Sequence, residues 1–301
     1  EWKNNKIRNF ILITNISIFK KHYQRLINSN TLNIIKKINM DDYESKKINI
    51  INIKATNKHE NALKSLKKAY ELTTNNHFIG ILTLPLNKQE IKKNFNKNFI
   101  DQTTFFSKLQ RVKNSNMIFM YKNKFFIPLT THIELNKVTN FFKKNNNNIY
   151  NKIKKINLSI KNDFKIRNPK MIIAGINPHA GEGGAISNDD INLLNPIIKK
   201  LQKNKIKIDG PISGDAMINE KNLKNYDVFI FTYHDQALIP FKMLSKFKGI
   251  NFTSNLNIIR VSPSHGTAKK LENKFATSLG LRNSIKAIRF INENRNQSKK
   301  F

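Results

Sequence analysis

The 301-residue sequence contains no cysteine and is poor in acidic residues, glycine and tryptophan. The absence of cysteine excludes disulfides, thiolate metal sites and a cysteine nucleophile, so any metal ion must be bound by histidine, aspartate or glutamate. No stretch approaches the roughly 18 consecutive apolar residues of a membrane-spanning helix. The lysine-rich start also lacks the apolar segment and cleavage site of a secretory signal. These absences predict a soluble, cytoplasmic protein with no membrane partner.

The charge is strongly unbalanced, with 54 Lys and Arg against 20 Asp and Glu and a formal net charge of +34. Such an excess is typical of proteins that bind nucleic acid or another polyanion. Here it is mostly lysine, scattered along the whole chain together with asparagine and isoleucine. No zinc-finger spacing, basic-zipper heptad or RNA-binding aromatic motif accompanies it. We therefore expect no nucleic-acid partner, although the positive field would attract small anionic substrates.

Apolar runs of four to seven residues alternate with segments of helical periodicity, which predicts an α/β fold with a parallel or mixed sheet. The predicted strands are residues 10–14, 48–53, 78–82, 117–121, 125–129, 171–176 and 228–233. A helix is predicted over 61–72, and Ser187 with Asp190 predicts a capping box before another helix. The lysine- and asparagine-rich segment 143–155 predicts a helix end or a surface loop, with no function assigned.

Three histidines follow predicted strands: His132 in TTHIEL, His179 in NPHAGEGG and His234 in YHDQ. Ligands bind beyond the carboxyl ends of strands in open α/β sheets, so these imidazoles could converge on one site. Three neutral imidazoles leave open positions on a divalent ion, which could then polarise a hydroxyl or carbonyl oxygen. The alternative is that each is a hydrogen-bonded structural histidine.

Six of the ten glycines lie between residues 175 and 214. NPHAGEGG predicts a glycine-rich loop whose backbone N–H groups could face an anion, but it matches neither the dinucleotide fingerprint nor the P-loop. Lys88, Lys242 and Arg260 could each bind a phosphate or carboxylate. In so basic a chain, the alternative for each lysine is a solvated surface charge.

The order of the motifs TTHIEL, INPHAGEGG, GPISGD, YDVFIFTYHDQALIPFK and GINFTSNLNIIRVSPSHGTA resembles the 4-hydroxythreonine-4-phosphate dehydrogenase family of vitamin B6 biosynthesis. The resemblance covers about residues 60–285. It implies a two-lobed α/β/α fold similar to isocitrate and isopropylmalate dehydrogenases, with the active site in the interlobe cleft. We expect residues 1–100 and 272–301 in one lobe and 101–271 in the other. A homodimer that shares its metal site between subunits is also implied.

The resemblance implies an NAD- or NADP-dependent oxidation of 4-phosphooxy-L-threonine, followed by decarboxylation to 3-amino-2-oxopropyl phosphate, with one divalent ion (Zn, Mg or Co). The metal ligands of the family fall on His132, His179 and His234. The substrate-binding positions fall on Gln102, Thr103, Lys242, Asn251 and Arg260, and the catalytic ones on Asp235 and Lys242, with Asp215 in support. The cofactor-binding loop falls on His265, Gly266, Thr267 and Ala268.

The sequence also departs from the family pattern. The N-terminal segment G-x-P-x-G-I-G-P-E is absent, so we expect either a fragment or the loss of that loop. The family's Gly-His-Thr appears as Asp101-Gln102-Thr103, and glutamine can donate a hydrogen bond but cannot exchange a proton near neutral pH. Two alternatives therefore stay open: a related dehydrogenase of a phosphorylated sugar acid, such as threonate or erythronate phosphate, and a decayed, basic nucleic-acid-binding pseudoenzyme.

Overall fold

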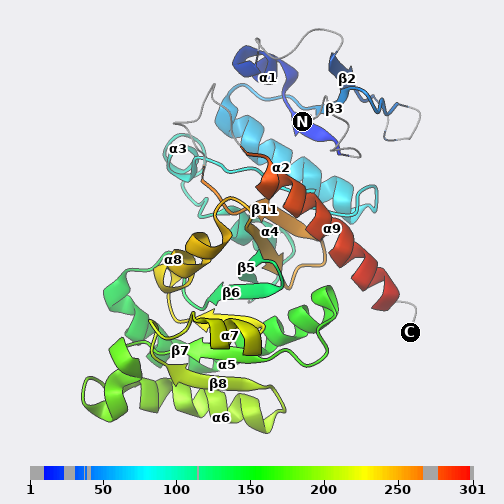
Figure 1. The fold of residues 1–301 in the computed structure, drawn as a ribbon. Helices are drawn as coiled ribbons and strands as arrows, with labels where there is room; N and C mark the ends of the chain where they lie inside the picture. Colours follow the sequence, from blue (N-terminus) through cyan, green and yellow to red (C-terminus); the bar gives the residue numbers. More distant parts are fainter. Residues whose placement is uncertain are drawn as a thin grey trace.

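The computed structural model describes residues 10–23, 31–36, 38, 42–113, 115–266 and 277–298 (Figure 1). The strands are β1 (Leu12–Thr14), β2 (Leu32–Ile34), β3 (Ile48–Asn52), β4 (Ile81–Leu82), β5 (Asn116–Tyr121), β6 (Lys124–Pro128), β7 (Met171–Ala174), β8 (Ile208–Ile212), β9 (Val228–Phe231), β10 (Ile250–Ser254) and β11 (Arg260–Pro263). The helices are α1 (Ile16–Tyr23), α2 (Lys58–Thr74), α3 (Lys88–Asn94), α4 (Gln102–Leu109), α5 (Val138–Phe164), α6 (Asn195–Lys203), α7 (Glu220–Asn225), α8 (His234–Ser245) and α9 (Leu279–Ser298).

A mixed sheet of eight strands forms the centre of the fold, in the order β4-β11-β10-β5-β6-β9-β7-β8. Strands β6, β9, β7 and β8 are mutually parallel, whereas β5 is antiparallel to both β6 and β10, and β10 is antiparallel to β11. A separate parallel sheet, β1-β3-β2, lies at one end of the molecule (Figure 1). The predicted α/β class and mixed sheet are confirmed.

The central strands are apolar on both faces because helices cover both sides of the sheet. Phe125, Ile127 and Ile230 point into a core formed with α5, α6 and α9. Their neighbours Phe126, Phe229 and Phe231 point the other way, into a core formed with α8 and the segment around Met217. This alternation explains why the runs FFIP and VFIF carry no polar position. The helices α2, α3 and α4 enclose a third core.

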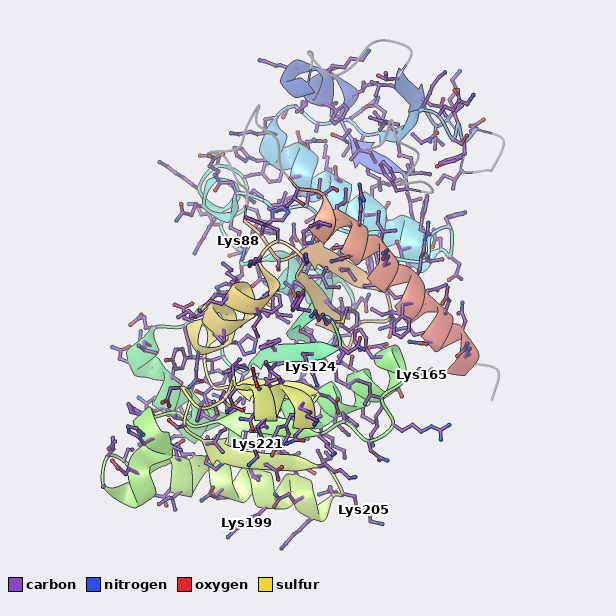
Figure 2. All side chains as sticks on the ribbon, in the orientation of Figure 1. Lys88, Lys124, Lys165, Lys199, Lys205 and Lys221 are labelled. Carbon is purple, nitrogen blue, oxygen red and sulfur yellow. The ribbon has the colours of Figure 1, made fainter. Side chains whose placement is uncertain are left out.

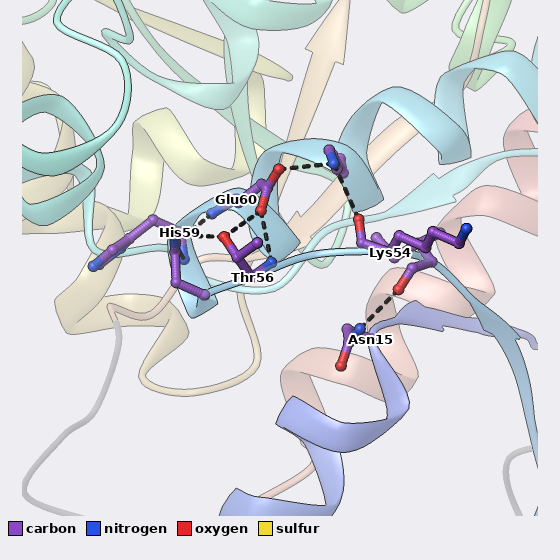
Figure 3. A network of polar contacts seen from close by, with 8 residues as sticks. Asn15, Lys54, Thr56, His59 and Glu60 are labelled. Carbon is purple, nitrogen blue, oxygen red and sulfur yellow. Dashed lines mark hydrogen bonds and ion pairs between the residues drawn. The ribbon is translucent and has the colours of Figure 1, made fainter.

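A polar network at the start of α2 joins this helix to the small sheet (Figure 3). Asn57 caps the helix by accepting from the backbone N–H groups of His59 and Glu60. Hydrogen bonds from Lys64 and Thr56 lower the pKa of the Glu60 carboxyl to about 2. Lys64 also donates to the carbonyl of Lys54 at the end of the β3 connection. The network fixes the direction in which the chain leaves β3.

Two local predictions are wrong. Segment 143–155 is neither a helix end nor a loop but the middle of α5, where Ile149, Tyr150 and Ile153 are buried. Ser187 and Asp190 form no capping box, because the Ser187 hydroxyl bonds to Asp189 instead. The seven predicted strands are all present with shifted ends, but β2, β8, β10 and β11 were not predicted.

The proposed lobe boundaries stay a prediction. Residues from both ranges meet in one sheet, since β4 pairs with β11, and α9 packs against β11. None of the described helices combines the length and hydropathy needed to cross a bilayer. The lysines labelled in Figure 2 are spread over α3, β6, α6, α7 and the loops that follow α5 and α6, in keeping with their scatter along the sequence.

Candidate functional site

Three strands bring the predicted metal ligands to one edge of the sheet. β6, β9 and β7 are neighbours and run in the same direction, so the segments that follow them emerge at the same edge. His132 follows β6, His234 opens α8 after β9, and His179 lies in the turn after β7. The rings of His132 and His234 are 5.7 Å apart between centroids and tilted by 38°.

Carboxylates flank this histidine pair. His234 Nδ1 lies 2.6 Å from Asp235 Oδ1, and His132 Nε2 lies 3.5 Å from Asp101 Oδ2. Burial lowers the pKa of the His132 imidazole, and the charges of Lys88 and His234 add to the effect while Asp101 opposes it. A neutral imidazole is the form that binds a metal ion. The donor set of this pair therefore fits part of a divalent metal site.

His179 lies in a left-handed turn, Pro178–Gly184. His179, Ala180 and Glu182 have φ of 51°, 51° and 47°, and Gly181, Gly183 and Gly184 also have positive φ. The left-handed region costs an L-residue about 1–2 kcal/mol, so the surrounding structure must hold this turn in place.

The His179 side chain is exposed. It interacts electrostatically with Asp215, whose pKa is lowered mainly by a hydrogen bond from Ser213 and to a smaller extent by His179. Among the described residues, no hydrogen bond, ion pair or ring contact joins His179 to His132 or His234. The described residues of a single chain contain no group of three side chains placed to hold a metal ion. The histidines are thus gathered at one edge without forming a complete ligand set in one chain.

A buried arginine lies at the same edge of the sheet. Arg260, at the start of β11, is 3% exposed. Its Nε and Nη2 donate to Thr83 Oγ1 at 3.1 and 2.8 Å, and its Nη1 donates to Thr253 Oγ1 at 3.1 Å. Nη2 also donates to Gln102 Oε1. Burial lowers the pKa of Arg260 to about 10, which leaves the guanidinium charged at neutral pH.

The partners of Arg260 are all neutral. No carboxylate in the described part of the chain lies within ion-pair distance of the guanidinium, and the nearest acidic influence is that of Asp101. Burying a charge without a counter-ion is costly. Its four hydrogen bonds also leave one of its five N–H groups without a partner in the described part of the chain. The arrangement is suited to an anionic ligand that supplies the missing charge.

Gln102 is committed to this cluster. Its Oε1 accepts from Thr83 Oγ1 at 2.8 Å as well as from Arg260, and its Nε2 donates to the Leu84 carbonyl at 2.9 Å. Neighbouring Thr103 lies 3.4 Å from Thr253, between the hydroxyl oxygens. Gln102 therefore braces the guanidinium, and the structure shows it bonded to protein groups on both sides of its amide.

Asp101 connects the arginine cluster with the histidine pair. It caps α4 by accepting from Thr104 N at 2.8 Å through Oδ1, while Oδ2 faces His132. It is 4% exposed, and its charge raises the pKa of both His132 and Arg260 against the effect of burial. The α4 start thus carries Asp101 toward the imidazoles, and Gln102 and Thr103 toward Arg260.

The strand ends are also tied to each other. Thr130 Oγ1 donates to the Thr232 carbonyl, and Thr232 Oγ1 lies 3.2 Å from the Gly175 carbonyl. Gln236 donates through Nε2 to Gly175 O at 3.0 Å and accepts from Thr232 through Oε1. These bonds fix the chain shortly before His132 and His179 and on both sides of His234.

The structure shows fewer contacts for the remaining predicted site residues. Asn251 lies on β10, and its buried Oδ1 has no hydrogen-bond partner among the residues that the structure describes. Lys242 is exposed in the last turn of α8. His265 and Gly266 are exposed after β11, with His265 Nδ1 3.0 Å from Gly266 O. Thr267 and Ala268 lie outside the described residues.

A cavity of about 200 Å³ beside α4 is lined by Asp101, Thr104 and Lys108 among others, but by none of the three predicted metal ligands. A cavity of about 600 Å³, lined by Lys170, Asp209 and Tyr226 among others, lies at the opposite, amino end of β7 and β9. The interlobe cleft therefore stays a prediction.

Comparison with known protein families shows which family this chain belongs to. Residues 6–288 match the family model described as pyridoxal phosphate biosynthetic protein PdxA. The chain belongs to the PdxA family. Among curated relatives, 4-hydroxythreonine-4-phosphate dehydrogenase of Aquifex aeolicus is 40% identical over 218 residues, which are 71% of this chain and 64% of the relative. The enzyme of the same name from Wigglesworthia glossinidia brevipalpis is 38% identical over 202 residues, 66% of this chain and 59% of the relative.

The matched region spans about 60% of the length of these PdxA relatives. The structural similarity covers more of the chain than these pairwise sequence matches do. A crystal structure of 4-hydroxythreonine-4-phosphate dehydrogenase from Klebsiella pneumoniae superposes with a TM-score of 0.79 over 97% of this chain and 95% of that chain, at 22% identity. The shared fold confirms the predicted α/β class, and the family model confirms the predicted family.

Sequence reasoning missed Thr83, Thr253 and the role of Asp101. Thr83 and Thr253 are single threonines in or after short strands, and nothing in their sequence context distinguishes them from other β-strand threonines. Asp101 carried a usable signal, because an aspartate directly before a helical segment is a preferred N-cap.

Proposed function

We propose that this protein is a metal-dependent NAD(P) dehydrogenase that oxidises 4-phosphooxy-L-threonine and releases carbon dioxide, giving 3-amino-2-oxopropyl phosphate. Its membership in the PdxA family and the names of its relatives support this reaction. The observation that carries the proposal is the buried, uncompensated Arg260 at the same sheet edge as the His132–His234 pair. Arg260 would bind an anionic group of the substrate, and the site at the His132–His234 pair would act on a hydroxyl group nearby.

The substrate would be held by its charged ends. Arg260 offers a guanidinium to a phosphate or carboxylate oxygen, and the hydroxyl of Thr103 lies beside Thr253 in the same cluster. Asn251 has a buried Oδ1 in need of a donor, which the substrate ammonium group would supply. Lys242 is exposed and long enough to approach a bound anion from α8. These contacts orient the substrate hydroxyl toward the histidines.

His132, His179 and His234 are the proposed ligands of one divalent ion. Such an ion supplies positive charge that lowers the pKa of a substrate hydroxyl and stabilises negative charge on its oxygen. Asp235 and Lys242 are the proposed proton-transfer groups. Two proton transfers are needed: the hydroxyl proton is removed as hydride leaves the carbon, and a proton is returned to carbon after the carboxylate is lost. His265, Gly266, Thr267 and Ala268 are proposed to bind NAD or NADP, which accepts the hydride.

We propose that the working form is a homodimer with the metal site shared between subunits. Support comes from the incomplete ligand set of one chain and from large apolar side chains exposed beside it. Ile133 and Leu135 follow His132, and Ile239 and Met243 lie four residues apart on α8, with Met243 74% exposed. A second copy covering these side chains would bury them and bring in the remaining ligand. We place this enzyme in the cytoplasm, where NAD(P) is available.

The reaction is tested with the purified full-length protein, a divalent ion, NAD or NADP and 4-phosphooxy-L-threonine. NAD(P)H should appear with release of carbon dioxide, chelation should stop it, and Arg260→Lys should raise KM because lysine keeps the charge but not the planar fork. Faster turnover of threonate or erythronate phosphate would instead identify a sugar-acid dehydrogenase. Absence of turnover, combined with nucleic-acid binding that weakens steeply with salt, would refute the enzyme assignment.

The dimer is tested with Met243→Glu. Sedimentation should show dissociation toward monomer together with weaker metal binding, since the charge would be buried at the interface. A monomeric protein that binds the metal ion with full affinity would contradict the shared site.

A further inference from the structure

The His179 turn is built from residues that do not favour its conformation. Three of its non-glycine residues are left-handed. Its internal backbone hydrogen bonds are all 3.1 Å or longer: Ala180 N to Asn177 O and Ala185 N to Glu182 O at 3.1 Å, and Ile186 N and Ser187 N to Gly181 O at 3.2 and 3.3 Å. An exposed turn of this kind needs an anchor in the protein interior if it is to present His179 in one position.

Asp190 provides that anchor. Its carboxylate is 1% exposed and accepts from Ile176 N at 2.6 Å through Oδ1. Through Oδ2 it accepts from the backbone and side-chain amides of Asn177, at 3.3 and 3.1 Å. All three donors lie immediately before the turn that carries His179.

The same carboxylate lies under the turn itself. A Cβ on Gly175 would come 2.9 Å from Asp190 Oδ1, and a Cβ on Gly181 would come 3.4 Å from Oδ2 and 2.3 Å from Ser187 O. The two glycines therefore allow the backbone to close around Asp190. No cation of the described chain pairs with this carboxylate, so its charge is compensated by the N–H donors of Ile176 and Asn177, just before the turn.

Asp190 is also rigidly supported. It begins the π-helical turn Asp190–Leu194, which continues into α6, and Leu194, Ile197 and Leu201 are buried in the main core. On the other side, the Gly175 carbonyl is held by Gln236 and Thr232. The entry to the turn is thus fixed between α6 and the strand that leads to His234.

We propose that Asp190 is a positioning residue, which sets the location of His179 and thereby the affinity of the metal site, without itself touching metal or substrate. This inference rests on the proposed function, in which His179 is a metal ligand. Groups that orient metal ligands commonly contribute 10–100-fold to metal affinity.

The test is the affinity of the metal-free, full-length protein for Co²⁺, measured by competition with a chromogenic chelator and by the visible spectrum of bound Co²⁺. In Asp190→Asn an amide nitrogen replaces one acceptor and faces an N–H donor. We expect affinity to fall about 10–100-fold and the cobalt spectrum to change, because His179 no longer has a single position. Affinity for inorganic phosphate should stay within about twofold, since the Arg260 cluster is held by other residues.

The matched control is Asp163→Asn. Asp163 is also a buried carboxylate, and its Oδ1 lies 2.7 Å from Arg295 Nε. This ion pair is not part of the candidate site. This variant should lose stability and keep its Co²⁺ affinity. A fall of equal size in both variants would show a general effect of destabilisation and would overturn the positioning role.

Two further variants separate the possible failures. If Asp190→Asn does not fold, Asn177→Ala removes only the side-chain bond to Asp190 and should weaken Co²⁺ binding by up to about tenfold. Normal affinity in the folded Asp190 or Asn177 variant, while His179→Ala loses the metal, overturns this inference alone. Unchanged affinity in His179→Ala refutes the proposed ligand role of His179, and the inference with it.

Discussion

Thr83→Val probes the buried charge that the proposed function depends on. Valine has nearly the shape of threonine, so the change removes a hydroxyl without opening a cavity. In the wild-type protein that hydroxyl accepts from Nε and Nη2 of Arg260 and donates to Gln102. Thr83 is 3% exposed, so water cannot replace the lost bonds freely.

The magnitude follows from the number of donors left without a partner. Leaving a buried donor unsatisfied costs about 1–3 kcal/mol, more when the group is charged. Nε loses its recorded partner and Nη2 keeps only Gln102. We therefore expect the free energy of unfolding to fall by about 2–4 kcal/mol. Thr253→Val removes one bond to the guanidinium, from Nη1, and should cost about half as much.

Urea unfolding monitored by circular dichroism measures these differences at constant m-value. Thr83→Ser, which retains the hydroxyl, should lose less than Thr83→Val. In a double-mutant cycle with Arg260→Met, the threonine hydroxyl should contribute about 1–3 kcal/mol less when the guanidinium is absent. Equal stability of Thr83→Val and Thr83→Ser, or additivity in the cycle, would show that Arg260 does not depend on Thr83, and the reasoning would be refuted.

Three other outcomes follow from the structure. Phe126→Ala should destabilise the protein by about 3–5 kcal/mol in urea unfolding, because its fully buried ring stacks on Phe229 and Phe231; exposed Phe290→Ala should cost less than about 1 kcal/mol. Gly249→Ala should cost about 1–3 kcal/mol, since a Cβ there would lie 2.4 Å from Phe241 Cζ, and an unchanged urea midpoint would contradict this. Burial lowers the pKa of Lys152 to about 8 in the folded state, so the unfolded chain binds more protons between about pH 8 and 10.5 and Lys152 makes stability rise with pH in that window. Unfolding measured from pH 7 to 10.5 should show this rise in the wild type and in the control Lys154→Met but a smaller one in Lys152→Met; identical pH profiles would exclude the effect.

Strands with strong apolar runs could be predicted from the sequence, and weak ones could not. FFIP, MIIA and VFIF are buried on both faces and have a composition that only a covered sheet explains. IDGPI and RVSP contain glycine, proline or charge, so local pattern gave no basis for β8 or β11. They become strands because β7 and β10 offer them a pairing edge, which is a tertiary effect. The same holds for α5, where Ile149, Ile153 and Ile156 keep a buried stripe among asparagines and lysines.

The site shows a similar division. Histidines at strand ends could be predicted, because the direction of parallel strands decides where their carboxyl ends meet. The support beneath them could not, since Asp190 lies 11 positions from His179 and acts through backbone N–H groups whose direction depends on the left-handed turn. Thr83 and Gln102 meet Arg260 across 177 and 158 residues of chain. A sequence motif therefore indicates which side chains do chemistry, whereas the residues that hold them in place are chosen by the fold and become visible only when strand register is known.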